Sequence, residues 1–367
     1  MNKKKISKNL LSKVNILSIE KFFDVIILSQ DFFATKIFLD KHKFKYTAYD
    51  FAKCFSMPIK PKDLDILSER LDIKFIFNNE IVFAEKFEKE FINITKLTNN
   101  LPQAKGQTIC FIDTGIYPHF DFLFPKNRII KFIDLINHKN QPYDDNGHGT
   151  FVAGVASSNG ILDKTNTGFA VMSNIIMIKA LSKDGSSSSN TILDAMQWIY
   201  ENYKKYKINT VCMSFGADSL EVGDPLSKGA EILWKKGITV VAAGGNSGPD
   251  HNTIKSPGCN PRIITVGSFD KDSMQISNFS SRGPTLFGSK PDLIAPGVDV
   301  VSCSMTPPYY STMSGTSVST PIIAGICANL KGINPKITNE EIKSYLINHC
   351  HHITFDKNDE GAGYIKF

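Results

Sequence analysis

Three side chains that can perform one reaction together lie far apart in this chain. Asp113 ends the apolar run CFID, His148 lies in NGHGTFVAG, and Ser317 lies in SGTSVSTP. A serine hydroxyl is a weak nucleophile at neutral pH, and it attacks a carbonyl when an imidazole accepts its proton. The imidazole needs a carboxylate on its other nitrogen, which fixes the tautomer and stabilises the cation. We therefore interpret these residues as a candidate catalytic triad.

Each of the three residues alone also has an ordinary structural explanation. An aspartate at a strand end is commonly a helix cap or a turn former, and a histidine between glycines is commonly a surface loop residue. The combination favours chemistry, because each type occurs at an expected strand end or helix start, in the chain order Asp, His, Ser.

A fourth polar residue, Asn246, follows the apolar run VVAAGG. Its amide and the backbone N–H of Ser317 are expected to form the oxyanion hole, which binds the negative charge that develops when a carbonyl is attacked. The alternative is an asparagine that serves only as a turn residue. Two further expectations concern local geometry. Gly147 and Gly149 are expected to leave room for a peptide beside the imidazole. Pro321 is expected to lie in the first turn of the helix that carries Ser317.

The apolar runs from residue 108 onward describe the scaffold that must position these residues. Five β-rich runs end in glycine or small polar residues: TICFIDTG, NIIMIKAL, NTVCMSFG, ITVVAAGG and RIITVGSF. Stretches with helical spacing lie between them, at NTILDAMQWIYENYKKY and PLSKGAEILWKKG. Apolar strands separated by helices are typical of a parallel sheet covered on both faces, with ligands at the carboxyl ends of the strands. We expect an α/β domain with a doubly wound, mostly parallel sheet over residues 108–367.

The N-terminal region has a different pattern and is expected to form a smaller unit over residues 1–85. Its runs read as strand, helix, strands, helix and strand: FDVIILS, DFFATKIFLDKHK, FKYTAYDFAKCFSM, KPKDLDILSERLDI and KFIFNNEIVFAE. That order suits a ferredoxin-like α+β unit. Residues 86–107 are charged and Asn-rich and read as an exposed connector.

Composition limits the classes of function and the compartment. The chain has 367 residues, of which 42% are hydrophobic and 21% are charged, and its net charge is +6 without a long basic tract, so we expect no nucleic-acid partner. The 7 cysteines have no CxxC spacing and read as free thiols in a reducing compartment. Charges interrupt the apolar runs of the N-terminus, so we expect no signal peptide and no membrane span. A cytoplasmic protein is favoured, although a secreted protein without its signal would read the same.

From residue 108 the chain resembles the subtilisin-like serine proteases, the subtilases of peptidase family S8. The matching motifs occur in order: DTGI at 113–116, HGTFVAG at 148–154, SFG at 214–216, AAGGNSG at 242–248, SNFSSRGP at 277–284, PDLIAPGVDVVS at 291–302 and GTSVSTP at 315–321. Val318 and Ser319 stand where Met-Ala is commoner in the family, and Gly244 where alanine is usual. The resemblance implies a serine endopeptidase that works through an acyl-enzyme and needs no cofactor for catalysis.

By position and element order, the N-terminal unit is similar to the inhibitory prodomain of many subtilases. Such a prodomain assists folding, occupies the substrate groove and is removed by the enzyme itself, so the chain would be a zymogen. We expect self-processing after Glu85, with cleavage near Phe83, Glu88 or Glu90 as alternatives. An unrelated accessory domain is the other interpretation of this unit.

The resemblance also implies how substrate binds, as an extended strand between the segments KDGSS and SFG. The residues expected to contact it are Gly185, Ser186, Ser214, Phe215, Gly216, Gly245 and Lys255. Lys255 falls where the family places the base of the P1 pocket, usually with a small residue. A lysine there would match an acidic P1 side chain. The alternative is that this loop turns the ammonium into solvent.

Asp121 matches a position that ligates Ca²⁺ in many subtilases. With the polar loop at 157–168 it could supply oxygen ligands, so a structural Ca²⁺ is one expectation and its absence the other. The substrate is a peptide or protein, cut either for processing, such as leader removal from a modified peptide, or for general intracellular degradation. Two interpretations remain: the chain is a catalytically silent binding scaffold, or it is an enzyme that its prodomain keeps latent.

Overall fold

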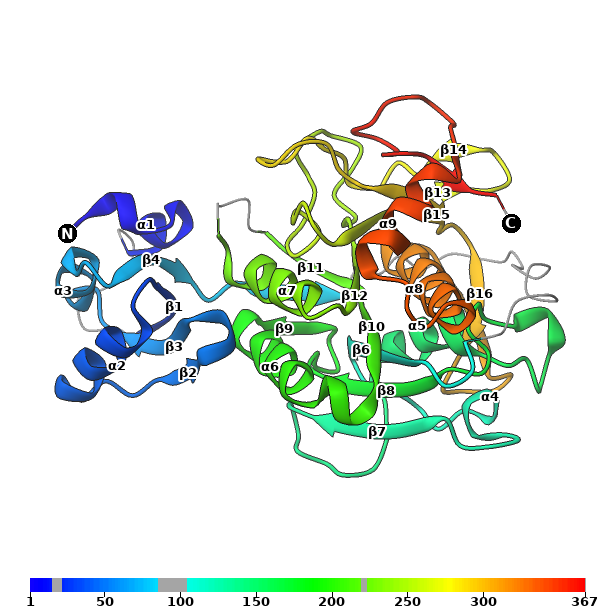
Figure 1. Cartoon of the computed structure of the whole chain (residues 1–367), viewed down its shortest axis with the longest axis horizontal. Helices are drawn as coiled ribbons and strands as arrows, with labels where there is room; N and C mark the ends of the chain where they lie inside the picture. The colour runs from blue at the N-terminus through cyan, green and yellow to red at the C-terminus, as the bar shows by residue number, and fades with distance from the viewer. Residues whose placement is uncertain (15–21, 85–103, 219–222, 367) are drawn as a thin grey trace.

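A computed structural model describes residues 1–14, 22–84, 104–218 and 223–366. The N-terminal part forms a four-stranded antiparallel sheet in the order β2-β3-β1-β4, which is the ferredoxin-like order (Figure 1). Asp31 caps the helix that follows the first strand by accepting a hydrogen bond from the N–H of Ala34 at 3.0 Å. Its elements are η1 (Lys3–Lys5), α1 (Lys8–Val14), β1 (Phe23–Ser29), α2 (Phe32–Lys41), β2 (Thr47–Tyr49), η2 (Asp50–Ala52), β3 (Cys54–Ile59), α3 (Asp63–Glu69), β4 (Ile73–Asn78) and β5 (Ile81–Ala84).

The larger part is built on a sheet in the order β18-β19-β15-β13-β12-β10-β6-β8-β7, parallel from β19 to β7. Its strands are β6 (Thr108–Asp113), β7 (Ile129–Asp134), β8 (Asn174–Lys179), β10 (Ile208–Met213), β12 (Thr239–Ala243), β13 (Ile264–Asp270), β15 (Leu293–Pro296), β18 (Cys350–His351) and β19 (Tyr364–Ile365). Shorter strands are β9 (Ser186–Ser188), β11 (Phe215–Ala217), β14 (Gln275–Ile276), β16 (Val300–Cys303) and β17 (Tyr310–Met313). All residues of the central strands β6, β8, β10 and β12 are buried except Asn174 and Asn209, which are partly exposed, as their nearly unbroken apolar runs predict.

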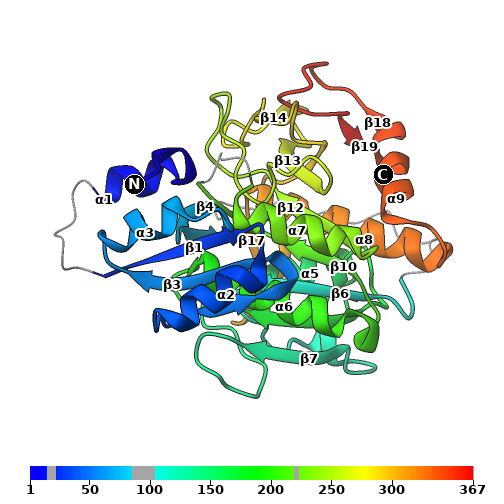
Figure 2. The same ribbon diagram turned by 60° about the vertical axis from the view of Figure 1, so that its left-hand side comes forward.

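Helices cover both faces of this sheet. α5 and α8 pack against each other on one face, and α6 and α7 pack against each other on the other (Figures 1 and 2). The helices are α4 (Phe120–Leu123), α5 (His148–Ser157), η3 (Lys164–Asn166), α6 (Ser189–Tyr206), α7 (Pro225–Lys235), α8 (Thr316–Ile333) and α9 (Asn339–Asn348). The predicted fold class, a mostly parallel α/β sheet with a small α+β unit, is confirmed.

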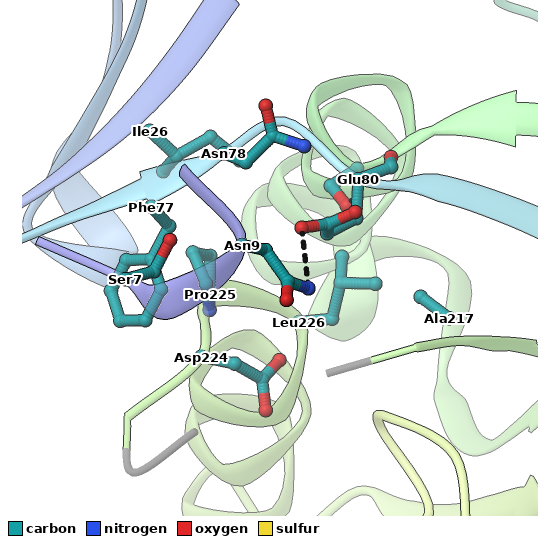
Figure 3. A pocket seen from close by; sticks show the side chains of 11 residues that line it. Ser7, Asn9, Ile26, Phe77, Asn78, Glu80, Ala217, Asp224, Pro225 and Leu226 are labelled. Atoms are coloured by element: carbon teal, nitrogen blue, oxygen red, sulfur yellow. Dashed lines mark hydrogen bonds between the residues drawn. The ribbon is translucent and has the colours of Figure 1, made fainter. Parts of the chain in front are cut away.

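The N-terminal sheet packs against α6 and α7 (Figure 2). Side chains alternate along β1, since successive residues of a strand point to opposite faces. Val25 and Ile27 belong to the core of the N-terminal unit, whereas Ile26 and Leu28 join the core of the larger domain. A small cavity remains at this boundary, lined by Asn9, Phe77 and Asp224 among others (Figure 3).

The last strand of the N-terminal unit leaves its own sheet. β5 pairs antiparallel with β11 on one side and with β9 on the other, so it is the middle strand of a three-stranded sheet. Among the described residues, no helix is both long and apolar enough to cross a membrane.

Candidate active site

Asp113 and His148 are joined by a buried hydrogen bond. The Nδ1 of His148 lies 2.7 Å from Oδ1 of Asp113, and each side chain is only 1% exposed. The same Oδ1 also accepts from the N–H of Thr114 at 2.7 Å. Because Oδ1 is an acceptor, Nδ1 donates this hydrogen bond, and in the neutral imidazole Nε2 then has the lone pair. Among the residues that the structure describes, this buried Nε2 has no hydrogen-bond partner.

The start of α5 is held by a second carboxylate, Asp144. Its Oδ1 accepts from the N–H of Gly147 at 2.9 Å, and its Oδ2 accepts from the N–H and hydroxyl of Thr150 at 2.9 and 2.7 Å. A buried carboxylate at this end satisfies first-turn N–H groups and complements the helix dipole. The sequence did not point to this role, although an acid four residues before the helix start is its signal.

Gly149, beside the histidine, has a packing role that the sequence did not predict. A Cβ on Gly149 would lie 2.2 Å from the carbonyl oxygen of Gly115 and 3.1 Å from Cβ of Asp113. Gly147 has a φ of +99°, in the region that side chains disfavour. Gly149 therefore lets the start of α5 lie directly against the end of β6, whereas Gly147 provides the backbone conformation that precedes the helix.

Ser317 is the second residue of α8, after the N-cap Gly315. The expectation for Pro321 is wrong, because it lies beyond the first turn, inside the helix. A proline there cannot donate to the carbonyl four residues earlier, which is that of Ser317. The hydroxyl of Ser214 donates to this carbonyl instead, at 3.0 Å.

These contacts place the three residues at one edge of the sheet. In the parallel pairing of β6 with β10, Ile112 lies opposite Met213, so the next residues, Asp113 and Ser214, emerge at neighbouring strand ends. Ser214 holds the backbone of Ser317, and Asp113 holds His148. His148 and Ser317, in the first turns of two helices, and Asp113, at a strand end, therefore lie at the carboxyl ends of the strands, where parallel sheets bind ligands.

Asn246 is tied to the same helix start. Its Oδ1 accepts from the N–H of Thr316 at 2.9 Å and from the Thr316 hydroxyl at 3.0 Å. The Thr316 hydroxyl in turn accepts from the N–H of Gly245 at 3.2 Å. These bonds fix which end of the Asn246 amide is oxygen, so its NH₂ donors point away from Thr316.

β5 lies along the residues that were expected to bind substrate. Ala84 lies opposite Phe215, and Phe83 lies opposite both Gly216 and Ser186. The N–H of Ala84 donates to the carbonyl of Gly185 at 2.7 Å. The expected cleavage residue, Glu85, and the connector up to residue 103 lie outside the described residues.

Lys255 lies against Gly245, the glycine expected to line the P1 pocket. A Cβ on Gly245 would lie 2.5 Å from Cγ of Lys255, so the lysine stem occupies that space. Its ammonium forms an ion pair with Asp218. The lysine side chain is 17% exposed, so it does not extend freely into solvent as the alternative interpretation held.

Asp121 is fully buried but is surrounded by hydrogen-bond donors. Oδ2 accepts from the hydroxyls of Ser158 and Tyr310 at 2.5 and 2.7 Å, and Oδ1 accepts from the N–H of Ile161 at 3.0 Å. Ca²⁺ needs oxygen ligands whose lone pairs are unused. These residues therefore do not fit the calcium site that the resemblance implied.

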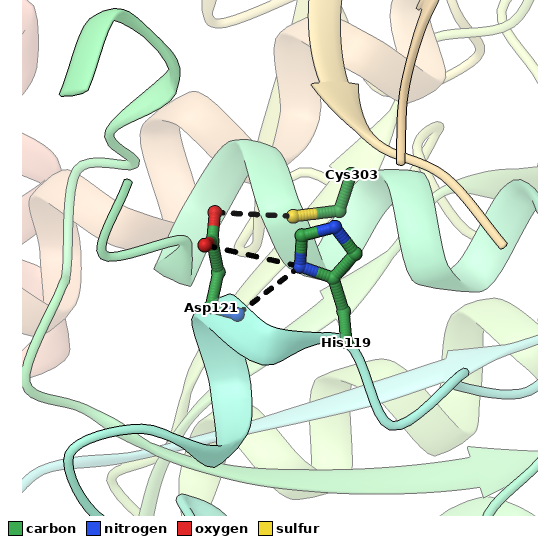
Figure 4. Close-up of side chains that lie close together, drawn as sticks. All are labelled: His119, Asp121 and Cys303. Atoms are coloured by element: carbon green, nitrogen blue, oxygen red, sulfur yellow. Dashed lines mark hydrogen bonds and ion pairs between the residues drawn. The ribbon is translucent and has the colours of Figure 1, made fainter. Parts of the chain in front are cut away.

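His119 and Cys303 lie beside Asp121 (Figure 4). Nδ1 of His119 accepts from the N–H of Asp121 at 3.1 Å, and its Nε2 donates to the carbonyl of Tyr309 at 2.9 Å. Burial lowers the pKa of His119 and raises the pKa of the Cys303 thiol well above its usual range. The neutral ring and the protonated thiol complete a hydrogen-bonded cluster around Asp121.

Comparison with known proteins agrees with this geometry. Residues 104–364 match the subtilase family. The chain is 39% identical over 327 residues to the serine protease AprX of Bacillus subtilis, which covers 80% of this chain and 73% of AprX. It is 33% identical over 228 residues to the thermophilic serine proteinase of Bacillus sp. strain AK1, covering 62% of this chain and 52% of that protein. It is 35% identical over 251 residues to the subtilase-type proteinase RRT12 of Saccharomyces cerevisiae, covering 66% of this chain and 47% of that protein.

The chain therefore belongs to the subtilase family and is a subtilisin-like serine endopeptidase. It spans about half the length of the second and third of these relatives. Its substrates are peptides or proteins, and subtilases need no cofactor for catalysis.

Proposed function

We propose that Asp113, His148 and Ser317 hydrolyse peptide bonds as a catalytic triad. Nε2 of His148 accepts the proton of the Ser317 hydroxyl as Oγ attacks the substrate carbonyl, and the imidazolium then protonates the leaving amine. Water attacks the acyl-enzyme in the same way and releases the acid. The hydrogen bond to Asp113 supports this proposal, because it keeps the proton on Nδ1 and leaves Nε2 as the base.

The oxyanion hole in this proposal is formed by the Asn246 amide and the N–H of Ser317. Helix N-termini carry N–H groups that the helix itself does not use. The bonds from Thr316 to Oδ1 of Asn246 support this assignment, since they fix the amide against the start of α8.

The observation that carries the proposed function is the pairing of β5 between β9 and β11. β5 is an extended segment in the place proposed for a substrate strand. In this binding mode backbone hydrogen bonds provide affinity, and pockets for the side chains provide specificity. Ala84 lies opposite Phe215. In a peptide bound in the same register, the residue that follows the one at the place of Ala84 would therefore lie beside Ser214, at the edge proposed for the triad.

The same pairing supports the N-terminal unit as an inhibitory prodomain that is removed by self-processing. Cleavage after Glu85 would make Val82 the P4 residue, and Val82 is completely buried in the core of the larger domain. Intact-mass measurement of wild type and Ser317→Ala tests this. We expect a product that begins at Lys86 from wild type alone, and an N-terminus far from this residue would contradict the site.

For substrate choice we propose an acidic preference at P1, set by Lys255. The contact of its stem with Gly245 supports this, since it puts the lysine side chain at the wall of the expected pocket. Cleavage of a peptide library tests the preference and separates a narrow processing protease, such as one that removes a leader, from a general degrading one.

Fluorophosphonate labelling tests the chemistry itself. We expect the wild type to be labelled and Ser317→Ala to remain unlabelled. Ser319→Ala is the matched control, because Ser319 lies on the same helix and its hydroxyl donates to the backbone of Ala295 at 2.9 Å. Absence of both labelling and self-processing in a folded wild type would favour a binding scaffold.

We also propose that the enzyme works in a reducing compartment such as the cytoplasm. All 7 cysteines are free thiols, and six of them are buried, which supports this proposal.

A further inference from the structure

Lys255 is held by backbone hydrogen bonds on both sides of the expected P1 pocket. Its N–H donates to the carbonyl of Gly244 at 2.9 Å. The next residue, Ser256, exchanges two backbone hydrogen bonds with Ala217, of 2.9 and 3.0 Å. Lys255 therefore lies between the glycine segment that precedes Asn246 and the end of β11, the strand that pairs with β5.

The ion pair of this lysine with Asp218 is strongly asymmetric. The lysine side chain is 17% exposed and its stem is packed on Gly245, whereas the Asp218 side chain is 83% exposed. An ammonium that is largely removed from water needs a negative partner, because its desolvation is otherwise uncompensated. An exposed carboxylate loses little when it moves away, because water replaces the ion pair.

We propose that Asp218 is the resident counter-ion of the P1 pocket and that an acidic P1 side chain displaces it. This inference rests on the proposed acidic preference at Lys255. When a substrate glutamate binds, its carboxylate replaces that of Asp218. The Lys255 ammonium keeps a negative partner, and the Asp218 side chain moves into solvent. A neutral P1 residue leaves the resident pair intact. Asp218 thus competes with acidic substrates, and it determines how strongly the enzyme discriminates between charged and neutral P1 residues.

The test compares kcat/KM for fluorogenic peptides that differ only at P1, as Glu, Gln or Leu, with the processed enzyme. The variants are Asp218→Asn, Lys255→Met and the double substitution. Asp250→Asn is the matched control, since Asp250 is exposed on the same domain and its removal changes the net charge equally. We expect Asp218→Asn to raise the Glu:Gln ratio about tenfold, whereas Asp250→Asn leaves it unchanged. In the Lys255→Met background, Asp218→Asn should have no effect on the ratio.

Two results would overturn the inference, and they differ. If Lys255→Met abolishes the Glu:Gln preference but Asp218→Asn leaves or lowers it, Asp218 is not the competitor and the acidic preference stands. If neither wild type nor Asp218→Asn prefers Glu and Lys255→Met changes nothing, the acidic preference itself is wrong. Cleavage of the Leu peptide shows in both cases that the variants are folded and active.

Discussion

The hydroxyl of Ser214 donates to the backbone carbonyl of Ser317 at 3.0 Å. It replaces the helical N–H that Pro321 lacks, and both serines are buried. The strand end of β10 thereby supports the residue that we propose as nucleophile, so the position of this serine depends on a neighbouring strand as well as on its own helix.

Loss of this hydroxyl should therefore weaken both stability and chemistry. We expect Ser214→Ala to lower the free energy of unfolding by about 1–3 kcal/mol, because a buried carbonyl loses its partner, and to slow fluorophosphonate labelling. Adding Pro321→Ala supplies the missing N–H and should recover part of the stability. Urea unfolding of the single and double variants measures this, and equal destabilisation with and without Pro321→Ala would contradict it.

Lys179 is a fully buried cation at the end of β8, beside the strand that carries Asp113. Its ammonium donates to the carbonyls of Thr114 and Leu181 at 2.5 and 3.0 Å and to Asp145 at 2.6 Å. We expect Lys179→Met to cost about 3–5 kcal/mol in urea unfolding, because it leaves these acceptors without their cation. Asp145→Asn should cost less, since that side chain is partly exposed and can be hydrated. Equal costs would argue against this explanation.

The donors around Asp121 predict stability that does not depend on calcium at this site. We expect Tyr310→Phe to lower the free energy of unfolding by about 1–3 kcal/mol, because it removes a donor to a buried carboxylate. We expect EDTA to shift the Tm of wild type and of Asp121→Asn equally, since no ion is lost from Asp121 in either protein. Thermal unfolding with Ca²⁺ or EDTA checks this, and an EDTA effect that disappears in Asp121→Asn would refute it.

Asp224 should make stability depend on pH. Burial raises its pKa to about 6 from 3.8, against hydrogen bonds from the N–H of Ser227 and the hydroxyl of Ser256 that lower it. A raised folded-state pKa means that the folded state binds the proton more tightly than the unfolded state. The contribution of protonated Asp224 to the free energy of unfolding is therefore fully present below about pH 4 and is lost as the pH rises through about 6.

The variant that tests this is Asp224→Asn, which keeps an oxygen for both donors but cannot ionise. Relative to wild type, its free energy of unfolding should gain about 2 kcal/mol between pH 4 and pH 7, because the wild type must bury a charge there. Urea unfolding at several pH values gives this difference, and parallel curves for the two proteins would show that Asp224 does not titrate in this range.

Local patterns accounted for much of the secondary structure. The expected runs at 108–115, 174–181 and 238–245 contain β6, β8 and β12, and the run at 209–216 covers β10 except for its first residue, Ile208, because buried parallel strands need nearly continuous apolar residues. The sequence did not reveal β7, whose run IIKFID mixes charged and apolar residues at an edge of the sheet, or α1, which precedes the first expected strand.

The amino-acid sequence by itself determined the α/β pattern, the N-terminal element order and the identity of the Asp, His and Ser candidates, because periodicity and residue type are local properties. Only the tertiary structure decided that β5 lies between β9 and β11, that Ser214 holds Ser317, and that Asp218 pairs with Lys255. It also decided that the hydroxyls of Tyr310 and Ser158 donate hydrogen bonds to the carboxylate of Asp121, where the resemblance implied a calcium ligand. Such pairings depend on which distant segments become neighbours in the folded chain. A short motif does not specify which donors from other segments will surround it.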